Sequence, residues 1–213
     1  MMLPTHALAG MALALPVAAV APEATGIALV AGLVGGVFPD LDLYVGHRRT
    51  LHFPVYYTLL AAIAVPLAFV SPTTLTIVVA AWALAAAAHC LADVFGGGLE
   101  LRPWEATADR AVYDHFNGRW IAPKRWVRYD GAPEDLAASL VLAAALWGPV
   151  DGPLRTVVAA ALVVAVVYAA LRRVLPTVAE RLVGVLPAHL VGYLPARYLE
   201  AGEHATSVSH DSQ

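Results

Sequence analysis

The stretch from residue 38 to residue 52 concentrates side chains that could bind a metal ion within an otherwise apolar part of the chain. It holds two aspartates, two histidines and two arginines, namely Asp40, Asp42, His47, Arg48, Arg49 and His52. Carboxylate oxygens and imidazole nitrogens are ligands for Zn²⁺ and neighbouring divalent metals. A charged side chain at the centre of a bilayer costs about 2.5–3.5 kcal/mol. These residues should therefore lie at a membrane surface, pair with one another or bind a cation.

Three further residues could join this stretch from other parts of the chain. His89 and Asp93 are four residues apart, so on a helix they share one face and could hold a single metal. Taken alone, they could equally be a buried, hydrogen-bonded histidine and a polar residue at a helix end. His6 is an isolated histidine in an apolar segment, and only its expected depth beside the other candidates favours a role at the site.

The candidate ligands are seven residues: His6, Asp40, Asp42, His47, His52, His89 and Asp93. Asp40 and Asp42 are two residues apart in a turn that we expect to be extended, so both should point the same way. Whichever is not fully committed to a metal could act as general base, and Arg48 could neutralise a phosphate oxygen. Arg49 is better explained as a membrane anchor. A weaker second cluster consists of Asp114, His115 and Asn117.

The rest of the chain consists largely of apolar runs that favour membrane helices. The apolar share is 60%, against about 45–50% in a soluble domain. Six runs are expected to form helices: 5–21, 24–38, 52–70, 74–95, 133–147 and 154–175. Thr5 should cap the first of them, and Pro16 should kink it. The sequence therefore predicts an all-α fold, a polytopic membrane helix bundle of about six transmembrane helices.

This pattern is accounted for by one integral membrane domain, residues 1–201, because no linker rich in Pro, Gly or Ser separates two soluble parts. Residues 5–95 form the expected metal-site half, 96–132 a polar cytoplasmic loop and 133–175 a helical hairpin. Residues 176–201 should form an interfacial C-terminal segment, and 202–213 a disordered tail. The chain has a single cysteine, so an intrachain disulfide is excluded.

The distribution of basic residues predicts which side of the membrane the candidate site faces. With six spans, the N-terminus, residues 39–51, the long loop and the C-terminal tail lie on one side. Twelve of the thirteen Lys and Arg residues fall there, all except Arg155. The positive-inside rule assigns that side to the cytoplasm. We therefore expect a multi-pass protein of the cell membrane whose candidate ligands lie at the cytoplasmic ends of its helices.

Four short motifs occur in a fixed order: Thr5-His6-x-x-x-Gly10, Pro39-Asp40-Leu41-Asp42, Gly46-His47-Arg48-(x3)-His52, and His89-x-x-x-Asp93 followed by Gly and Trp104. This order, over residues 5–105, resembles the membrane-bound metal-dependent hydrolases of the YdjM-like, LexA-regulated inner-membrane group. The resemblance implies a helical membrane protein with a metal site, distantly similar to zinc-dependent phospholipase C and P1-type nucleases. Three positions depart from the family pattern: Leu43, Arg49 and Leu51. One potential ligand is missing as a result, which leaves the number of metals open.

Together, the residues and the resemblance predict an integral membrane metal-dependent hydrolase. Its cofactor would be a divalent metal, preferably Zn²⁺, and its substrate a phosphoester or phospholipid-like molecule. Nucleic acid is a less favoured partner that the sequence does not exclude. Two other classes stay open: a transporter or ion carrier, and a non-catalytic membrane protein with a structural metal. Against transport, the polar residues gather at one membrane face, and the fifth and sixth apolar runs carry none at their centres.

Overall fold

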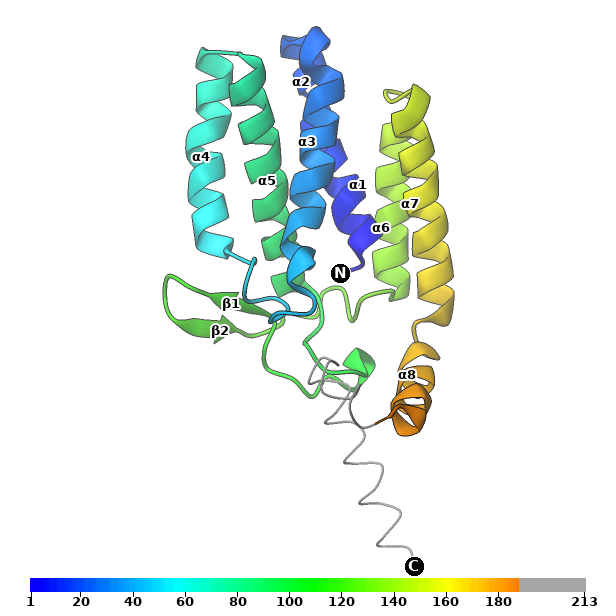
Figure 1. Ribbon diagram of the computed structural model, residues 1–213. Coiled ribbons are helices and arrows are strands. Elements are labelled where there is room, and N and C mark those ends of the chain that lie inside the picture. Colours follow the sequence, from blue (N-terminus) through cyan, green and yellow to red (C-terminus); the bar gives the residue numbers. More distant parts are fainter. Residues whose placement is uncertain (188–213) are drawn as a thin grey trace, which may run out of the picture.

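Helices dominate the computed structural model, which describes residues 1–187 (Figure 1). In a segment without water each backbone amide must bond within the segment, and uncharged runs of Ala, Val and Leu satisfy this requirement as α-helices. The helices are α1 (Leu3–Ala14), α2 (Val17–Val20), α3 (Thr25–Val37), α4 (Pro54–Val70), α5 (Thr74–Phe95), α6 (Pro133–Trp147), α7 (Gly152–Leu171) and α8 (Leu175–Val185). Short 3-10 turns add η1 (Pro22–Ala24), η2 (Phe38–Asp42) and η3 (Pro103–Glu105).

The structure supports a membrane helix bundle but does not confirm six spans. Within residues 1–187, four helical stretches are long and apolar enough to cross a membrane: Leu3–Val20, Pro22–Asp42, Thr74–Phe95 and Gly152–Leu171. The helices α4 and α6 have only 17 and 15 residues. At 1.5 Å per residue they are about 25 and 22 Å long, shorter than the ~30 Å hydrocarbon core. Both nevertheless run alongside the longer helices (Figure 1).

The first apolar run agrees with expectation at its kink and differs at its start. The chain breaks between α1 and α2 at Pro16, whose ring does not fit a continuous helix. At the other end, α1 is preceded by Met2, so Thr5 lies inside the helix and the prediction that it caps the start is wrong. The Thr5 hydroxyl instead donates a hydrogen bond of 2.6 Å to Asp135.

Small residues let α1, α3 and α5 approach one another closely at the centre of the bundle. A Cβ atom on Gly10 of α1 would collide with the carbonyl oxygen of Gly32 on α3, and the reverse is also true. Gly35 of α3 meets the backbone of Trp82 in α5 in the same way. Such contacts matter in lipid, because burying an apolar side chain against another helix gives little advantage over burying it in acyl chains.

One buried carboxylate joins the α6–α7 pair to α1. Asp135 accepts hydrogen bonds from the Thr5 hydroxyl at 2.6 Å and from the Met2 amide at 2.7 Å. It also accepts from the amide of Gly131 at 3.1 Å, while Thr5 Oγ1 lies 2.7 Å from Ser139 Oγ. A buried carboxylate without donors would be costly. These bonds therefore fix the position of α6 along α1.

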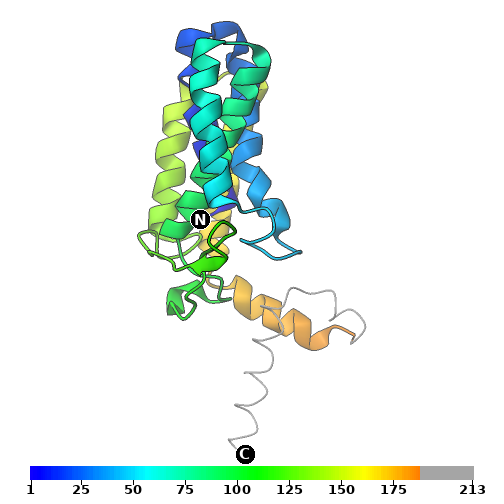
Figure 2. The same cartoon turned by 90° about the vertical axis from the view of Figure 1, so that its left-hand side faces the viewer.

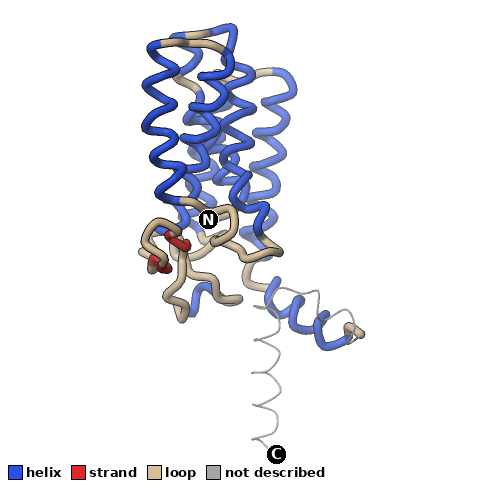
Figure 3. The backbone as a smooth tube through the Cα atoms, turned by 60° about the vertical axis from the view of Figure 1, so that its left-hand side comes forward, coloured by secondary structure: helices blue, strands red, loops and turns tan. Residues whose placement is uncertain are grey.

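The polar loop 96–132 contains a small antiparallel hairpin that the sequence analysis did not predict. Strand β1 (Val112–Asp114) pairs with β2 (Arg119–Ile121). The hairpin lies below the helices, at the end of the bundle that also carries the polar stretch 38–52 (Figure 3). Its strands are only three residues long, so the hairpin depends on contacts with the rest of the chain.

Two hydrogen bonds, from Tyr113 and His115, tie this hairpin to the polar stretch, and a third bond lies within its own tip. The Tyr113 amide donates to the Arg48 carbonyl at 2.9 Å. At the tip, the Asn117 side chain donates to Asp114 at 2.6 Å, and this bond lowers the pKa of the Asp114 carboxyl. His115 Nε2 lies 2.6 Å from the Arg49 carbonyl and donates to it. The hairpin thus holds the backbone of the polar stretch from outside the bundle.

The helix α8 covers the start of the segment expected to be interfacial, residues 176–201. Figure 2 shows α8 lying across the end of the bundle instead of along it. That direction is typical of a helix in the plane of a membrane surface. Residues 188–201 of the segment and the expected tail, 202–213, lie outside the described residues.

The close approach of α1 and α3 makes Gly10 and Gly32 sensitive to a single added methyl group. Gly10→Ala or Gly32→Ala should destabilise the protein by about 1–3 kcal/mol, because each Cβ collides with backbone that cannot move freely. Gly26→Ala is the matched control on α3, since its Cβ would meet nothing within 4 Å. Unfolding in detergent, followed by circular dichroism, measures the effect. Equal stability of all three variants would contradict this packing.

Candidate metal centre

Four side chains from three segments converge at the end of the bundle where η2 lies. Asp40 in η2, His52 just before α4, and His89 and Asp93 in α5 each offer one ligand atom, and these atoms lie within 4.8 Å of one another. The helix α5 supplies two of them because residues four apart stand on one helix face, as predicted. Asp40 is partly exposed, whereas the other three are buried.

The separations between these atoms match the edges of a tetrahedral metal site. The Nε2 atoms of His52 and His89 are 3.2 Å apart, and each lies 3.5 Å from Oδ2 of Asp93. Oδ1 of Asp40 lies 3.5 Å from Nε2 of His89 and 3.9 Å from that of His52. Ligand atoms held at about 2.0–2.1 Å by a tetrahedral zinc ion lie about 3.3–3.4 Å apart. The residues therefore fit a zinc ion, with Asp40 the loosest of the four.

Hydrogen bonds on the far side of both imidazole rings direct the Nε2 atoms to the centre. Nδ1 of His89 lies 2.6 Å from the Gly36 carbonyl, and Nδ1 of His52 lies 3.0 Å from Oδ2 of Asp42. Both partners accept hydrogen bonds, so each Nδ1 carries the hydrogen and donates it. In neutral rings both Nε2 atoms are then acceptors, and their repulsion at 3.2 Å is removed by a metal ion between them or by a second proton on one ring. Metal-ligating histidines are oriented by such bonds.

Asp42 orients its neighbours and is not among the four converging residues. Besides His52, its carboxylate accepts a bond from the Leu51 amide at 3.0 Å and lies 3.2 Å from Nδ1 of His47. The prediction that Asp40 and Asp42 point the same way is wrong, because residues 38–42 form a 3-10 turn and not an extended one. With three residues per turn, side chains two positions apart point about 120° away from each other.

Two predicted ligands, His6 and His47, lie just outside the group of four. Nε2 of His6 is 3.2 Å from Oδ1 of Asp93, and the His6 ring stacks on that of His89 with centroids 3.7 Å apart. Nδ1 of His47 lies 3.9 Å from Oδ1 of Asp40. Burial lowers the pKa of His47, which favours a neutral ring. Both histidines therefore support the ligands from the side.

Arg48 is engaged by Asp93 on both carboxylate oxygens. Its Nη2 lies 3.2 Å from Oδ1 and its Nε 3.2 Å from Oδ2, while Nη1 donates to the Gly97 carbonyl at 2.7 Å. The amino group of Met1 lies 2.6 Å from Oδ1 as well. The Arg48 side chain is buried, and its backbone is left-handed with a φ of 60°, which costs energy outside glycine. Arg48 thus fixes the Asp93 carboxylate while Oδ2 faces the two histidines.

The weaker cluster predicted in the long loop lies outside the converging group. Asp114 and Asn117 bond each other, and His115 bonds the Arg49 carbonyl. The Arg49 guanidinium stacks over the ring of Tyr113 at 4.8 Å from the centroid. These residues build the hairpin and its attachment to the polar stretch.

Two glycine carbonyls in the site were not predicted from the sequence, those of Gly36 and Gly97. Gly36 bonds His89 and Gly97 bonds Arg48. A Cβ atom on Gly36 would collide with the carbonyl oxygen of His6, so glycine at this position lets the His6 ring reach that of His89. Glycines next to each group of charged residues were visible in the sequence and were the available signal.

Metal content should respond differently to the two aspartates on either side of His52. Asp93→Asn should lower the zinc bound per protein molecule more than Asp42→Asn, because Asp93 faces the metal position and an asparagine at 42 can still accept the His52 hydrogen bond. Arg49→Ala is the control and should keep full occupancy. In the wild type, zinc at about 100 times its Kd should raise the free energy of unfolding by ~2.7 kcal/mol. Zinc analysis beside thermal unfolding measures both, and full occupancy in Asp93→Asn would remove Asp93 from the centre.

Comparisons with known proteins gave no relative from which a role for these residues could be inferred. A scan against models of protein families, a search of curated proteins and a search of solved structures each gave no match. What the centre does must therefore be inferred from its own residues.

Proposed function

We propose that the protein is an integral membrane metal-dependent hydrolase that acts on a phosphoester or phospholipid-like substrate at the cytoplasmic face of the cell membrane. The observation that carries the proposal is the convergence of Asp40, His52, His89 and Asp93 at separations that suit zinc. The resemblance to the YdjM-like hydrolases belongs to the same proposal, since its motifs contain all four residues.

Among the four converging residues, Asp40 is the one that meets open space. Its side chain is 18% exposed, against 0% for both histidines and 1% for Asp93, and it borders a cavity of about 650 Å³. Catalytic zinc sites use three protein ligands and leave one position open for the reaction. When bound, a divalent metal supplies positive charge that lowers the pKa of water and polarises a phosphoryl group. Asp40 is placed to take the proton of an attacking water as general base.

Arg48 and Leu43 define the cavity wall next to this carboxylate. The Arg48 guanidinium already bonds Asp93 and the Gly97 carbonyl, so it would act on a substrate phosphate as a fixed positive charge and not as a bidentate clamp. Leu43 stands where the family pattern has a histidine. Because it lines the same cavity, its apolar side chain favours one metal over two.

One observation favours a non-catalytic alternative. Asp93 is already paired with the Arg48 guanidinium and the Met1 amino group. The polar group could therefore be an ion-pair network that serves the fold, with or without a structural metal. The hydrolase predicts turnover that depends on Asp40, whereas the structural alternative predicts no turnover.

Hydrolysis of bis(4-nitrophenyl) phosphate by detergent-purified protein tests catalysis. A chelator should abolish activity and zinc should restore it. In zinc-loaded protein, Asp40→Asn should lower kcat by about 10²–10⁴-fold, the usual effect of losing a general base. Asp109→Asn, an exposed aspartate of the long loop, should leave kcat unchanged. Zinc-loaded, fully helical protein without turnover would contradict the hydrolase and support the structural alternative.

The cytoplasmic orientation is tested at Trp126 in the long loop, whose side chain is 75% exposed. A Trp126→Cys variant gives a single accessible thiol, because native Cys90 is fully buried. We expect no reaction with a membrane-impermeant maleimide in intact cells and rapid reaction after lysis, as the positive-inside rule requires. Labelling in intact cells would place the metal centre on the opposite side.

A further inference from the structure

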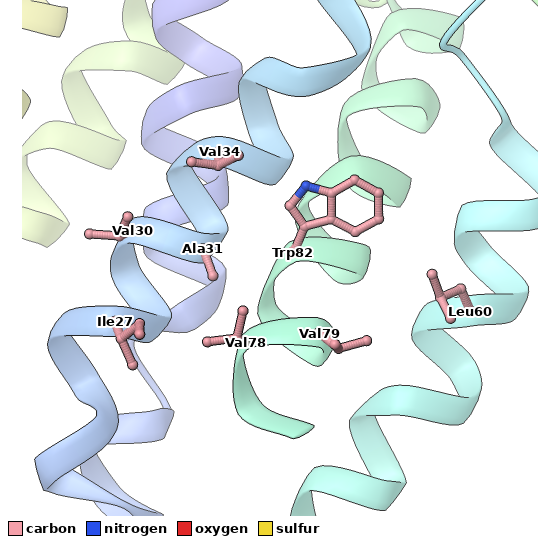
Figure 4. Close-up of a pocket in the computed structure, with 8 residues that line it drawn as sticks. All are labelled: Ile27, Val30, Ala31, Val34, Leu60, Val78, Val79 and Trp82. Atoms are coloured by element: carbon pink, nitrogen blue, oxygen red, sulfur yellow. The ribbon is translucent and has the colours of Figure 1, made fainter. Parts of the chain in front are cut away.

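Two hollows in the described part of the chain differ in their chemistry. Figure 4 shows one between α3, α4 and α5, with Val30, Leu60 and Val78 among a wholly apolar lining. The other, of about 650 Å³, starts at the metal centre and continues between the end of the bundle and α8. Sites for small ligands usually measure about 300–1,000 Å³ and combine an apolar wall with a few polar groups. Only the second hollow fits that description.

The polar end of this cavity belongs to the metal centre. Asp40, His47 and Arg48 line it there. The Arg48 guanidinium is buried and fixed by its bonds to Asp93, so its positive charge stays at the cavity wall. A phosphate group is the natural ligand for such a fixed charge beside a metal.

The opposite wall of the cavity is apolar and comes from α7 and α8. Val164 of α7 and Leu175, Val178 and Leu182 of α8 line it. An ion pair of 2.7 Å between Arg102 and Glu180 joins α8 to the polar loop and keeps this wall in place. Figure 2 shows α8 lying across the end of the bundle. In a membrane crossed by the bundle, a helix in that direction would lie where acyl chains meet head groups.

Between the two walls, Glu100 presents an unused carboxylate. Both of its oxygens are buried, and within residues 1–187 neither has a hydrogen-bond partner. Glu100 lines the cavity and packs over Gly98, where a Cβ atom would collide with the carboxylate. A buried carboxylate without a donor is costly. Its position in the cavity wall indicates that a ligand supplies the missing donor.

We propose that this cavity binds one phospholipid molecule. Its phosphate lies beside Asp40 and Arg48, a hydrogen-bond donor of its head group bonds Glu100, and an acyl chain follows the wall built by α7 and α8. The inference deepens the proposed hydrolase by naming its substrate class, and it rests on that function for the consequence that the bound phospholipid is cleaved. An amine and a hydroxyl would satisfy Glu100 alike, so head groups with either donor are expected to bind.

Native mass spectrometry of detergent-purified, chelator-treated protein measures binding without turnover. The probes are dioleoyl phosphatidylethanolamine, phosphatidylglycerol and phosphatidate, of which the last has neither an amine nor an alcohol. Ala179→Phe fills the cavity from α8 and should weaken binding of all three by about tenfold or more. Val185→Phe is the matched control on the same helix, at a residue that is 78% exposed and outside the cavity. Leu182→Trp fills the same wall independently and should act like Ala179→Phe.

Glu100→Gln tests the head-group contact separately. It should weaken binding of phosphatidylethanolamine, phosphatidylglycerol or both by about tenfold and leave binding of phosphatidate unchanged. Glutamine keeps an acceptor oxygen but loses the negative charge that strengthens the bond. Weaker binding of phosphatidylethanolamine alone identifies an ammonium group as the partner of Glu100. Weaker binding of phosphatidylglycerol alone identifies a hydroxyl group. Unchanged binding in both filling variants, or equal changes for all three lipids in Glu100→Gln, would overturn the proposal. Selective binding without phosphodiester turnover would keep the lipid site and refute the hydrolase, whereas turnover without lipid selectivity would do the reverse.

Discussion

Two imidazole nitrogens that face each other at 3.2 Å are the constraint on which the candidate metal centre depends. Each ring donates its other hydrogen to a fixed acceptor, the Gly36 carbonyl for His89 and the Asp42 carboxylate for His52. Neutral rings held this way repel each other, and a metal ion between them or a second proton on one ring removes the repulsion. The carboxylates of Asp93 and Asp40 complete the set with a negative charge that suits such a cation.

Helix packing in a lipid-compatible bundle explains how these rings come so close. The glycines of α1 and α3 bring the two backbones into contact, and both helices pack against a row of buried alanines on α5. Gly36 lies where α3 passes α1, so the same close approach supplies an acceptor for His89 and lets His6 stack on it. Packing of small residues and orientation of the metal ligands are therefore one feature of the fold and not two.

Groups outside the centre hold the charged residues next to it, and these in turn fix the groups inside it. The hairpin β1–β2 holds the Arg48 backbone in a left-handed conformation, and Arg48 in turn fixes Asp93. Asp135 performs the corresponding task on the other side, where it locks α6 to α1 through Thr5. Asp40 is the least constrained member of the group and the one that meets the cavity, which is the combination expected of a group that takes part in chemistry.

Periodicity predicted much of this arrangement, and chain geometry decided the rest. Apolar runs gave α3, α4, α5 and α6 to within two residues, whereas the first run is divided into α1 and α2, and the last ends at Leu171, four residues early. The spacing of four between His89 and Asp93 brought both side chains to the converging group. Residue types could not separate Asp40 from Asp42, because their roles depend on whether the backbone after Pro39 is extended or a 3-10 turn. The bonds of Arg48 and Thr5 join segments about 45 and 130 residues apart, and no local pattern encodes such partners.

X-ray absorption at the zinc edge, on protein purified with one equivalent of zinc, tests the central claim most directly. The geometry predicts a first shell of nitrogen and oxygen at about 2.0–2.1 Å with the outer-shell scattering of two imidazole rings. Removal of His52 or His89 should reduce that imidazole signal by half. Zinc coordinated only by solvent oxygen, or a spectrum unchanged by loss of either histidine, would contradict the metal centre.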